Sequence, residues 1–287
     1  MGVDDQRVVA DGRDRPSARP IDAGKRDLLG VLVDALDYDA AIGKVLAAVR
    51  ERRPFALTAL AVHGVMTGVN DPAHKARLNA LDVVAPDGQP VRWGLNLLHG
   101  TRLRDWVSGP ELVLRVLQRM AEEALPVYLY GSSPQTLDRL QQSLRQLFPT
   151  LQIAGTEPSK FRLARPGEPV EIAERIVASG ARLVFVGLGC PRQEAFVFGM
   201  RPLLDVPLMA VGAAFDYHAG LLRPAPTWMQ RSGLAWLWRL AREPRRLWRR
   251  YLVYNSEYLF LLVAQLVRLW RPGPGQPPDE RNESLPV

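Results

Sequence analysis

The sequence has few of the residues that build disulfides and metal sites. It contains one cysteine, Cys190, and four histidines. A single cysteine excludes an internal disulfide, and such sparse cysteine is typical of a reducing, cytoplasmic setting. No metal-ligand spacing with another histidine, a cysteine or a carboxylate pair is found for His63, His74, His99 or His218. We therefore predict that the protein uses no metal and no cofactor.

The sequence also lacks a long apolar run at its start. Residues 1–26 mix aspartate, arginine, proline and glycine, which argues against a signal peptide or a membrane anchor there. We expect this segment, and residues 272–287 at the other end, to be disordered tails. The serine elbow of hydrolases is absent, as is the three-glycine fingerprint of dinucleotide-binding proteins.

Basic residues exceed acidic residues by seven, and the excess is confined to one segment. Residues 231–271 hold nine arginines and two glutamates, so the rest of the chain is neutral overall. The same segment contains Trp236, Trp238, Trp248 and Trp270. Arginine mixed with tryptophan and leucine at helical spacing is typical of a helix on an anionic membrane surface, so we expect no nucleic-acid partner.

Short apolar strands alternate with amphipathic helices along most of the chain. Helices are expected between most of the strands. The expected strands cover residues 28–34, 55–60, 83–85, 126–130, 151–154, 183–189 and 207–212. This order predicts an α/β core over residues 27–230, built on a Rossmann-like, mostly parallel sheet with helices on both faces. Residues 231–271 would then form a basic, aromatic, helical appendage.

A carboxylate follows a buried strand within residues 80–90. The strand of residues 83–85 is stopped by Pro86, and Asp87 and Gly88 then form a tight turn. Ligands bind at the carboxyl ends of the strands in an open α/β sheet. Asp87 is therefore a candidate catalytic group, although a turn residue that caps the next helix would have the same local sequence.

Two further strand ends carry loops suited to ligands. Gly131 precedes two serines and a helix whose amino end could receive phosphate. The other loop has Gly187 and Gly189 for close backbone approach, followed by Gln193 and Glu194, which could bind a sugar hydroxyl or a base edge, or cap a helix. Because right-handed crossovers place these ends at one edge of the sheet, we predict a shared crevice.

Single residues near the strand ends are weaker candidates. Thr58 offers a hydroxyl on the second strand, and Asp216 follows the last strand, where it could contact a ligand or cap a turn. His63 could point into the crevice, although a place in the core or on a helix surface is the more ordinary one. Cys190 stands at an expected helix amino end, which would lower its pKa, but a packed loop residue is the simpler interpretation.

The appendage is expected to present one basic helical face. Its arginines occur at positions i, i+3, i+4, i+7 and i+8, namely Arg242, Arg245, Arg246, Arg249 and Arg250, although Pro244 could interrupt or restart the helix. The apolar stripe that follows is too short and too interrupted by polar residues to span a membrane. A helix in the plane of an anionic membrane is favoured over a terminal helix packed on the core or on another subunit.

Taken together, these motifs resemble the WecG/TagA/CpsF family of glycosyltransferases (glycosyltransferase family 26). The resemblance runs from about Leu28 to Trp270. It rests on the order of Ala-Pro-Asp-Gly-Gln-Pro at 85–90, Tyr-Gly-Ser-Ser-Pro at 130–134, Val-Gly-Leu-Gly-Cys-Pro-Arg-Gln-Glu at 186–194, Val-Gly-Ala-Ala-Phe-Asp at 211–216 and Trp-Leu-Trp-Arg-Leu-Ala-Arg-Glu-Pro-Arg-Arg at 236–246. Two positions depart from it: Leu60 replaces a frequent asparagine, and Ala235 replaces the usual glutamate.

The resemblance implies a GT-E type fold and transfer of a sugar from a UDP-sugar to a polyprenyl-diphosphate-linked saccharide, with inversion and without a metal. The sugar would be N-acetylmannosamine or a related hexose or uronic acid, used in cell-surface polysaccharide synthesis. The resemblance makes Asp87 the general base and places Thr58 and Gln193 in the sugar pocket. Gly88 and Gln89, next to Asp87, are further candidates for substrate binding. Arginines of the appendage, from Arg239 onward, would meet the diphosphate and the membrane. The enzyme would be peripheral on the inner face of the cell membrane, and a homo-oligomer is compatible with it.

Elementary chemistry adds one expectation. Inverting transfer needs a base within hydrogen-bond reach of the acceptor hydroxyl, and positive charge for the leaving diphosphate. With a neutral core, that charge has to come from residues 231–271, so we predict that the appendage closes over Asp87. The alternatives are a nicotinamide-dependent oxidoreductase on a similar sheet, against which the missing third glycine argues, and a non-catalytic membrane-binding module.

Overall fold

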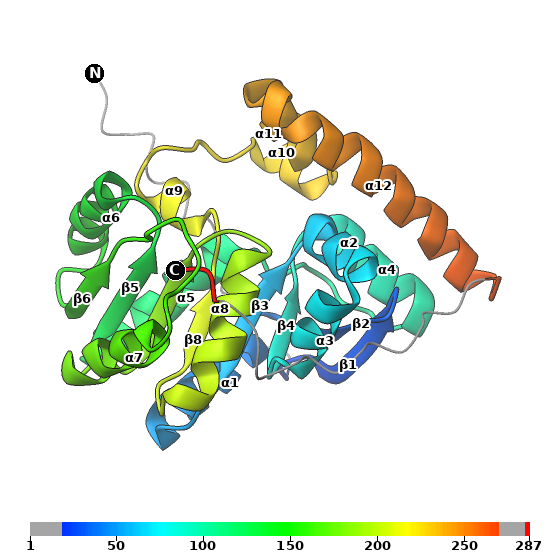
Figure 1. Cartoon of the computed structure of the whole chain (residues 1–287). Helices are drawn as coiled ribbons and strands as arrows, with labels where there is room; N and C mark the ends of the chain where they lie inside the picture. The colour runs from blue at the N-terminus through cyan, green and yellow to red at the C-terminus, as the bar shows by residue number, and fades with distance from the viewer. Residues whose placement is uncertain (1–18, 270–284) are drawn as a thin grey trace.

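A six-stranded parallel sheet forms the centre of the molecule (Figure 1). The computed structural model describes residues 19–269 and 285–287. The strand order is β4-β3-β8-β7-β5-β6, with bounds β3 Ala56–Leu60, β4 Val83–Pro86, β5 Val127–Gly131, β6 Ile153–Glu157, β7 Leu183–Gly187 and β8 Leu208–Ala210. The predicted Rossmann-like parallel sheet is confirmed.

Helices cover both faces of the sheet because its strands are apolar on both sides. On β5, for example, Tyr128 and Tyr130 enter one core cluster, whereas Val127 and Leu129 enter the other. The first face packs against α2 (Val62–Asn70), α3 (Pro72–Ala80), α4 (Gln89–His99), α7 (Glu168–Ala178) and α8 (Arg192–Met200), which the 3₁₀ helix η2 (Arg201–Leu203) follows. The second face packs against α1 (Tyr38–Glu51), α5 (Gly109–Glu122), α6 (Pro134–Leu147) and α9 (Ala214–His218).

The start of the fold differs from the prediction of one strand over residues 28–34. The structure has an antiparallel hairpin of β1 (Asp22–Leu28) and β2 (Val31–Leu36). Its two-residue turn is Leu29-Gly30, with φ values of 59° and 84°, the conformation that matches strand twist in tight hairpins. The apolar Leu29 concealed this turn in the sequence. Residues 22–26, which we assigned to a disordered tail, are therefore part of β1.

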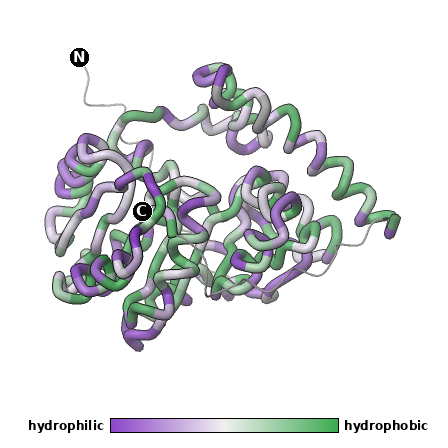
Figure 2. The backbone as a smooth tube through the Cα atoms, viewed as in Figure 1, coloured by the Kyte–Doolittle hydropathy of each residue, from purple (hydrophilic) through white to green (hydrophobic). Residues whose placement is uncertain are grey.

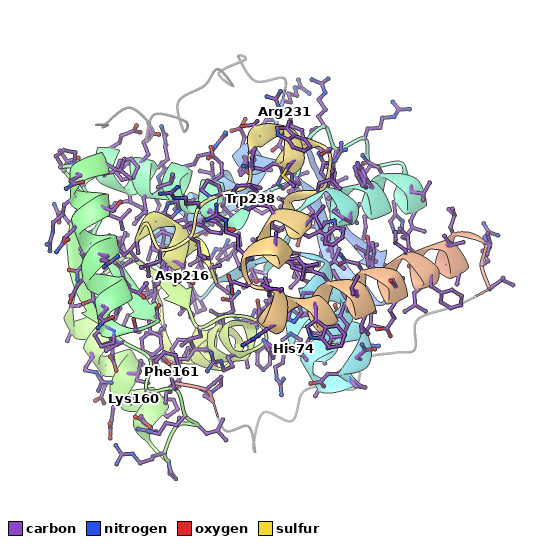
Figure 3. The ribbon with its side chains drawn as sticks, turned by 90° about the horizontal axis from the view of Figure 1, so that it is seen from above. His74, Lys160, Phe161, Asp216, Arg231 and Trp238 are labelled. Carbon is purple, nitrogen blue, oxygen red and sulfur yellow. The ribbon has the colours of Figure 1, made fainter. Side chains whose placement is uncertain are left out.

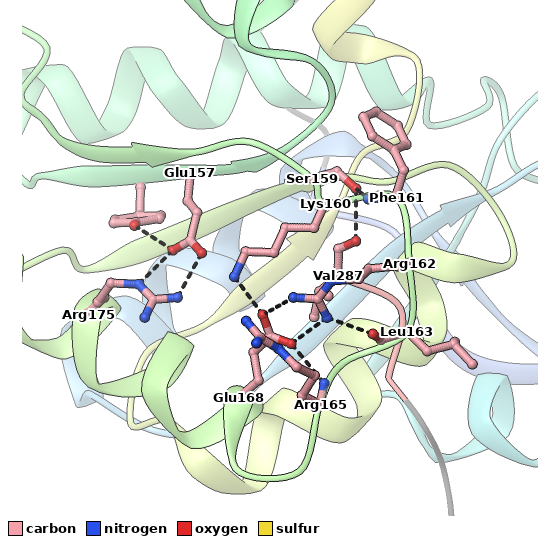
Figure 4. Close-up of polar contacts among 11 residues, drawn as sticks. Glu157, Ser159, Lys160, Phe161, Arg162, Leu163, Arg165, Glu168, Arg175 and Val287 are labelled. Atoms are coloured by element: carbon pink, nitrogen blue, oxygen red, sulfur yellow. Dashed lines mark hydrogen bonds and ion pairs between the residues drawn. The ribbon is translucent and has the colours of Figure 1, made fainter.

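The end of the chain also differs from the prediction of a disordered tail over residues 272–287. Leu285 and Val287 are buried, with Val287 only 1% exposed, and Pro286 bridges to Leu163. The carbonyl oxygen of Val287 accepts hydrogen bonds from Ser159 Oγ at 3.0 Å and from the Arg162 amide at 3.4 Å (Figure 4). The last three residues are thus fixed to the β6–α7 loop, and residues 270–284 lie outside the described part.

The appendage consists of two helices, α11 (Ala235–Arg242) and α12 (Pro244–Leu266), and the short helix α10 (Thr227–Arg231) leads into it from the core. Pro244 is the first residue of α12, where its missing amide and fixed φ are tolerated. Arg242 therefore ends one helix and Arg245 lies in the first turn of the next, so the prediction of one continuous arginine face is wrong. Arg246, Arg249 and Arg250 belong to α12, but their side chains lie outside the described atoms.

The long helix α12 lies across α2 and α4 (Figure 1). The Tyr258 hydroxyl donates a hydrogen bond to the Pro90 carbonyl at 2.8 Å, and Gln265 Nε2 donates to Asp27 at 2.9 Å. The exposed side chains of the helix are mostly apolar, and Figure 2 shows hydrophobic residues along much of its length. Within the described residues, no helix combines the length and apolarity required to cross a membrane.

Candidate active site

The strand ends that were singled out in the sequence meet in one large cavity. Its volume is about 2660 Å³, and it is lined by Asp87, by Ser132 after β5, by Gly187 and Gly189 after β7, and by residues of α11. Pockets for one small ligand typically measure ~300–1,000 Å³. A cavity of this size has room for a donor and part of an acceptor together.

Asp87 lines this cavity directly after β4. Its backbone amide donates a hydrogen bond to the Leu60 carbonyl at 3.1 Å, which extends the β3–β4 pairing by one residue. Its carboxylate accepts hydrogen bonds from the backbone amides of Gly88 and Gly109. Burial of the carboxyl group raises its pKa to about 6, although the two amides act in the opposite direction. At neutral pH it is ionised and more basic than an ordinary aspartate.

The appendage brings a cation to this carboxylate. Arg239 on α11 lines the cavity, and its charge lowers the pKa of Asp87. The guanidinium also lies over the Tyr217 ring, 5.9 Å from the centroid. A second contact between core and appendage is the hydrogen bond from Gln89 Nε2 to the Arg231 carbonyl at 3.0 Å. Asp87 and Arg239 thus come together from distant parts of the sequence.

The predicted sugar-pocket residues form a hydrogen-bonded group centred on Glu194. One oxygen of this completely buried carboxylate, Oε1, accepts bonds from Thr58 Oγ1 at 2.9 Å and from Gln193 Nε2 at 2.8 Å. Burial raises the pKa of Glu194, and the two hydrogen bonds oppose that shift. Gln193 and Glu194 line the cavity, whereas Thr58 is buried and does not. Gln193 Oε1 is buried and accepts no hydrogen bond from the part of the chain that the structure describes, so it is available to a ligand.

Two glycines bring the loops after β5 and β7 into contact. Gly131 has a φ of 102°, and a Cβ placed on it would lie 2.9 Å from the Gly187 carbonyl. Any larger residue would separate the two loops. Gly131 itself is buried, so Ser132 and Ser133 face the cavity in its place. Ser133 caps α6 by accepting a hydrogen bond from the Thr136 amide at 3.1 Å, and the helix amino end opens toward the cavity.

The sequence analysis missed an aromatic residue at the cavity wall. Phe161, in the β6–α7 loop, is 60% exposed with a φ of 52°, an unusual conformation for a bulky residue. The Arg192 guanidinium lies 5.9 Å from its ring centroid. Figure 3 shows Phe161 and Asp216 on the side of α6 and α7, and Arg231 and Trp238 on the side of the appendage. An aromatic residue in an otherwise polar loop after a strand was the only sequence signal.

The loop that carries Phe161 is held by a buried carboxylate. Glu168 accepts hydrogen bonds from Arg162 Nη1 and Lys160 Nζ, both at 2.6 Å, and from the Arg165 amide at 2.8 Å (Figure 4). The Arg162 and Lys160 contacts hold the pKa of Glu168 well below its usual range. Together with Val287, this network fixes the loop in place.

The core contributes more positive charge to the cavity than its net charge indicated. Arg50, Arg115 and Arg119 line the cavity but pair with Glu123, Glu111 and Glu122. The other four lining arginines form no ion pair within residues 19–269 and 285–287; they are Arg139, Arg192, Arg231 and Arg239. Two of these belong to the core, so the inference that all useful charge comes from residues 231–271 is wrong. A neutral sum does not reveal how charges are placed.

The remaining candidates take different positions. Gly88, Gly189 and Asp216 line the cavity, as does His63, whose ring lies 5.4 Å from that of Tyr254 on α12. Gln89 also lines the cavity. Its Oε1 accepts a hydrogen bond from Arg92 Nε at 2.8 Å, and its Nε2 donates to the Arg231 carbonyl, so Gln89 links elements of the fold. Neither Arg242 nor Arg245 lines the cavity. Arg242 lies over Trp238, 4.6 Å from the ring centroid.

Comparison with known proteins identifies the family of the chain. The model of the glycosyl transferase WecG/TagA/CpsF family matches residues 26–272. A relative from Bacillus spizizenii, named N-acetylglucosaminyldiphosphoundecaprenol N-acetyl-beta-D-mannosaminyltransferase, is 30% identical over 185 residues, which are 64% of this chain and 69% of the relative. The resemblance that the motifs indicated is therefore confirmed, and this chain belongs to the WecG/TagA/CpsF family of glycosyltransferases.

Proposed function

We propose that this protein transfers a hexosyl group from a UDP-sugar to a polyprenyl-diphosphate-linked saccharide, with inversion and without a metal. The sugar is N-acetylmannosamine or a related hexose or uronic acid, and the product serves cell-surface polysaccharide synthesis. The observation that carries the proposal is the position of Asp87. This basic carboxylate lies where the donor-type loops of β5 and β7 and the appendage meet.

The reaction requires one base and local positive charge. Asp87 takes the proton of the acceptor hydroxyl as its oxygen attacks the anomeric carbon, and the bond to UDP breaks on the opposite face. The leaving diphosphate gains negative charge, which Arg239 and Arg192 are placed to neutralise. These guanidiniums supply the charge that a divalent metal would otherwise supply.

The donor side of the cavity suits a nucleotide-linked sugar. The diphosphate is placed at the amino end of α6, where Ser132 and Ser133 face the cavity. Phe161 offers an aromatic face to the uracil ring, and such stacking is worth ~1–3 kcal/mol per base. Gln193 Oε1 can accept a hydrogen bond from a sugar hydroxyl or an acetamido N–H.

The test is a transfer assay with the full chain. We expect turnover with a polyprenyl-diphosphate-linked N-acetylglucosamine acceptor and one member of a panel of UDP-hexoses, and thermal protection by UDP but not by NAD. The alternative of an oxidoreductase requires the opposite protection. If neither UDP nor any UDP-sugar raises Tm, and vesicle binding persists, the protein is a membrane-binding module and the proposal is wrong.

We further propose that the enzyme sits on the cytoplasmic, inner face of the cell membrane through α12. The supporting observation is its exposed apolar side, on which Phe260 is 73% exposed; the other members are Leu252, Val253, Leu259, Val263, Leu266 and Val267. The opposite side is fixed to the core through Tyr258 and Gln265. A rigidly held helix with an apolar outer side would lie in the headgroup region, with nearby arginines meeting anionic lipid.

Vesicle flotation checks this surface. Replacing Leu259 and Val263 by serine should reduce binding to phosphatidylglycerol vesicles by at least about tenfold, because two aliphatic side chains leave the lipid. Serine at Val170 and Val177, equally exposed valines on α7, is the matched control and should bind as wild type. Unchanged binding of the α12 variant would contradict the proposed membrane contact. So would a wild-type protein that is dimeric without lipid and that the same substitutions convert to a monomer.

A further inference from the structure

Three potential metal ligands from three segments converge beneath the active-site cavity. They are His74 on α3, Cys190 in the β7–α8 loop and Glu194 on α8. The ring nitrogen, the sulfur and a carboxylate oxygen lie within 4.8 Å of one another. No sequence motif reveals this group, because His74 is more than a hundred residues from the other two. Our expectation of no metal site was based on spacing along the chain, which cannot detect such a cluster.

The donor set is chemically suited to a zinc-class ion. Zn²⁺ binds nitrogen at ~2.0–2.1 Å, thiolate at ~2.3 Å and carboxylate at ~2.0–2.2 Å, so ligand atoms around one ion lie roughly 3.5 Å apart. The cluster therefore needs only a small contraction to close around an ion. Three protein ligands with an open fourth position are a common zinc arrangement.

The second observation is the orientation of Glu194. Its Oε1 is held by Thr58 and Gln193, whereas its Oε2 is buried and, among the described residues, accepts no hydrogen bond from an N–H or hydroxyl group. The remaining side-chain donor to this carboxylate is the Cys190 thiol, whose proton a bound ion would replace. The Glu194 side chain is completely buried, and a carboxylate oxygen in that situation is costly unless a cation or a donor meets it. Hydrogen bonds from neighbouring residues to one oxygen are also the usual way in which a ligating carboxylate is oriented.

We propose that His74, Cys190 and Glu194 form a binding site for a zinc-class divalent cation. The ion reaches the site through the cavity, because Cys190 and Glu194 line it whereas His74 lies behind them. The site lies next to Arg192 in the chain, but binding of the ion does not depend on the proposed sugar transfer. Since Glu194 also holds Thr58 and Gln193, ion occupancy is coupled to the geometry of the predicted sugar pocket.

Cobalt spectroscopy tests the site on the full chain, reduced and freed of metal by a chelator. Titration with Co²⁺ should give about one equivalent of bound ion, with a near-ultraviolet thiolate-to-cobalt band that Zn²⁺ abolishes. Because Cys190 is the only cysteine in the chain, such a band reports this site alone. Binding without a thiolate band, or no stoichiometric binding, would overturn the proposal.

Variants and a chemical probe complete the test. Cys190→Ser should remove the near-ultraviolet band, and His74→Gln should weaken Co²⁺ binding at least about tenfold. His63→Gln is the matched control, since this histidine lines the same cavity outside the cluster, and it should keep the band. If His74→Gln does not fold, alkylation of Cys190 in the wild-type protein still decides. Zn²⁺ should slow the alkylation, and an unchanged rate counts against the site.

Discussion

Asp87→Asn is expected to lower kcat by about 10²–10⁴-fold, the usual contribution of a general base. Asparagine keeps the shape of the side chain and can still accept a bond from the Gly109 amide, but it cannot take a proton from the acceptor. In the wild-type enzyme, kcat/KM should fall about tenfold per pH unit below pH 6, because the pKa of the carboxyl group is raised to about 6. Initial rates across pH 5 to 8 measure both effects.

The same substitution is expected to leave the fold intact or to stabilise it. The folded-state pKa of Asp87 lies above its ordinary value of 3.8, so the folded protein binds the proton more tightly than the unfolded chain. The contribution of this group to stability is therefore lost as pH rises through about 6. At pH 7.5 the ionised carboxylate costs up to ~3 kcal/mol, which the neutral amide avoids. Urea unfolding should thus give Asp87→Asn a free energy of unfolding at least equal to that of wild type.

Asp39→Asn is the matched control, since Asp39 also lines the cavity but is exposed at the start of α1. It should retain wild-type turnover. Near-normal turnover by folded Asp87→Asn would contradict the assignment of the base. Equal losses in both variants would indicate that the overall negative charge of the cavity matters, rather than one carboxylate.

The parallel sheet could be predicted because its signals are local. Continuous apolar runs such as residues 183–187, flanked by helices of strong periodicity, specify buried parallel strands. The β1–β2 hairpin was missed because Leu29 occupies a turn position that usually calls for glycine or asparagine. Leu285 to Val287 were missed because three residues have no periodicity, and only the tertiary structure provides the pocket that buries them.

The site was predictable in its loops but not in its contacts. Asp87 and the loops after β5 and β7 follow from the rule that ligands bind at strand ends. The role of Glu194 in joining Thr58 to Gln193 depends on side-chain directions across 136 residues, which no local pattern encodes. The same limit explains why the sequence analysis did not predict the positive charge that core arginines bring to the cavity. Net charge is a sum over the chain, whereas the field in a cavity depends on which guanidiniums lack carboxylate partners.

The second large effect is expected at Arg239. Arg239→Gln should lower kcat/KM by about 10²–10³-fold, the scale observed when one preorganised group that stabilises developing negative charge is removed. It should also move the acidic limb of the pH profile of kcat/KM to higher pH, because the Arg239 charge lowers the pKa of Asp87. Arg239→Lys keeps the charge but loses the planar fork, so the limb should move less while part of the rate is still lost.

The shift of the pH profile separates an electrostatic role from a structural one. A variant that merely loosened α11 would lose rate at all pH values and leave the limb in place. Arg223→Gln is the matched control, because it removes one exposed positive charge outside the cavity and should change neither quantity. If Arg239→Gln loses rate with an unmoved limb, the appendage acts on the leaving group alone. If it loses no rate, Asp87 works without the appendage, and the cations of the core, Arg139 and Arg192, carry the diphosphate.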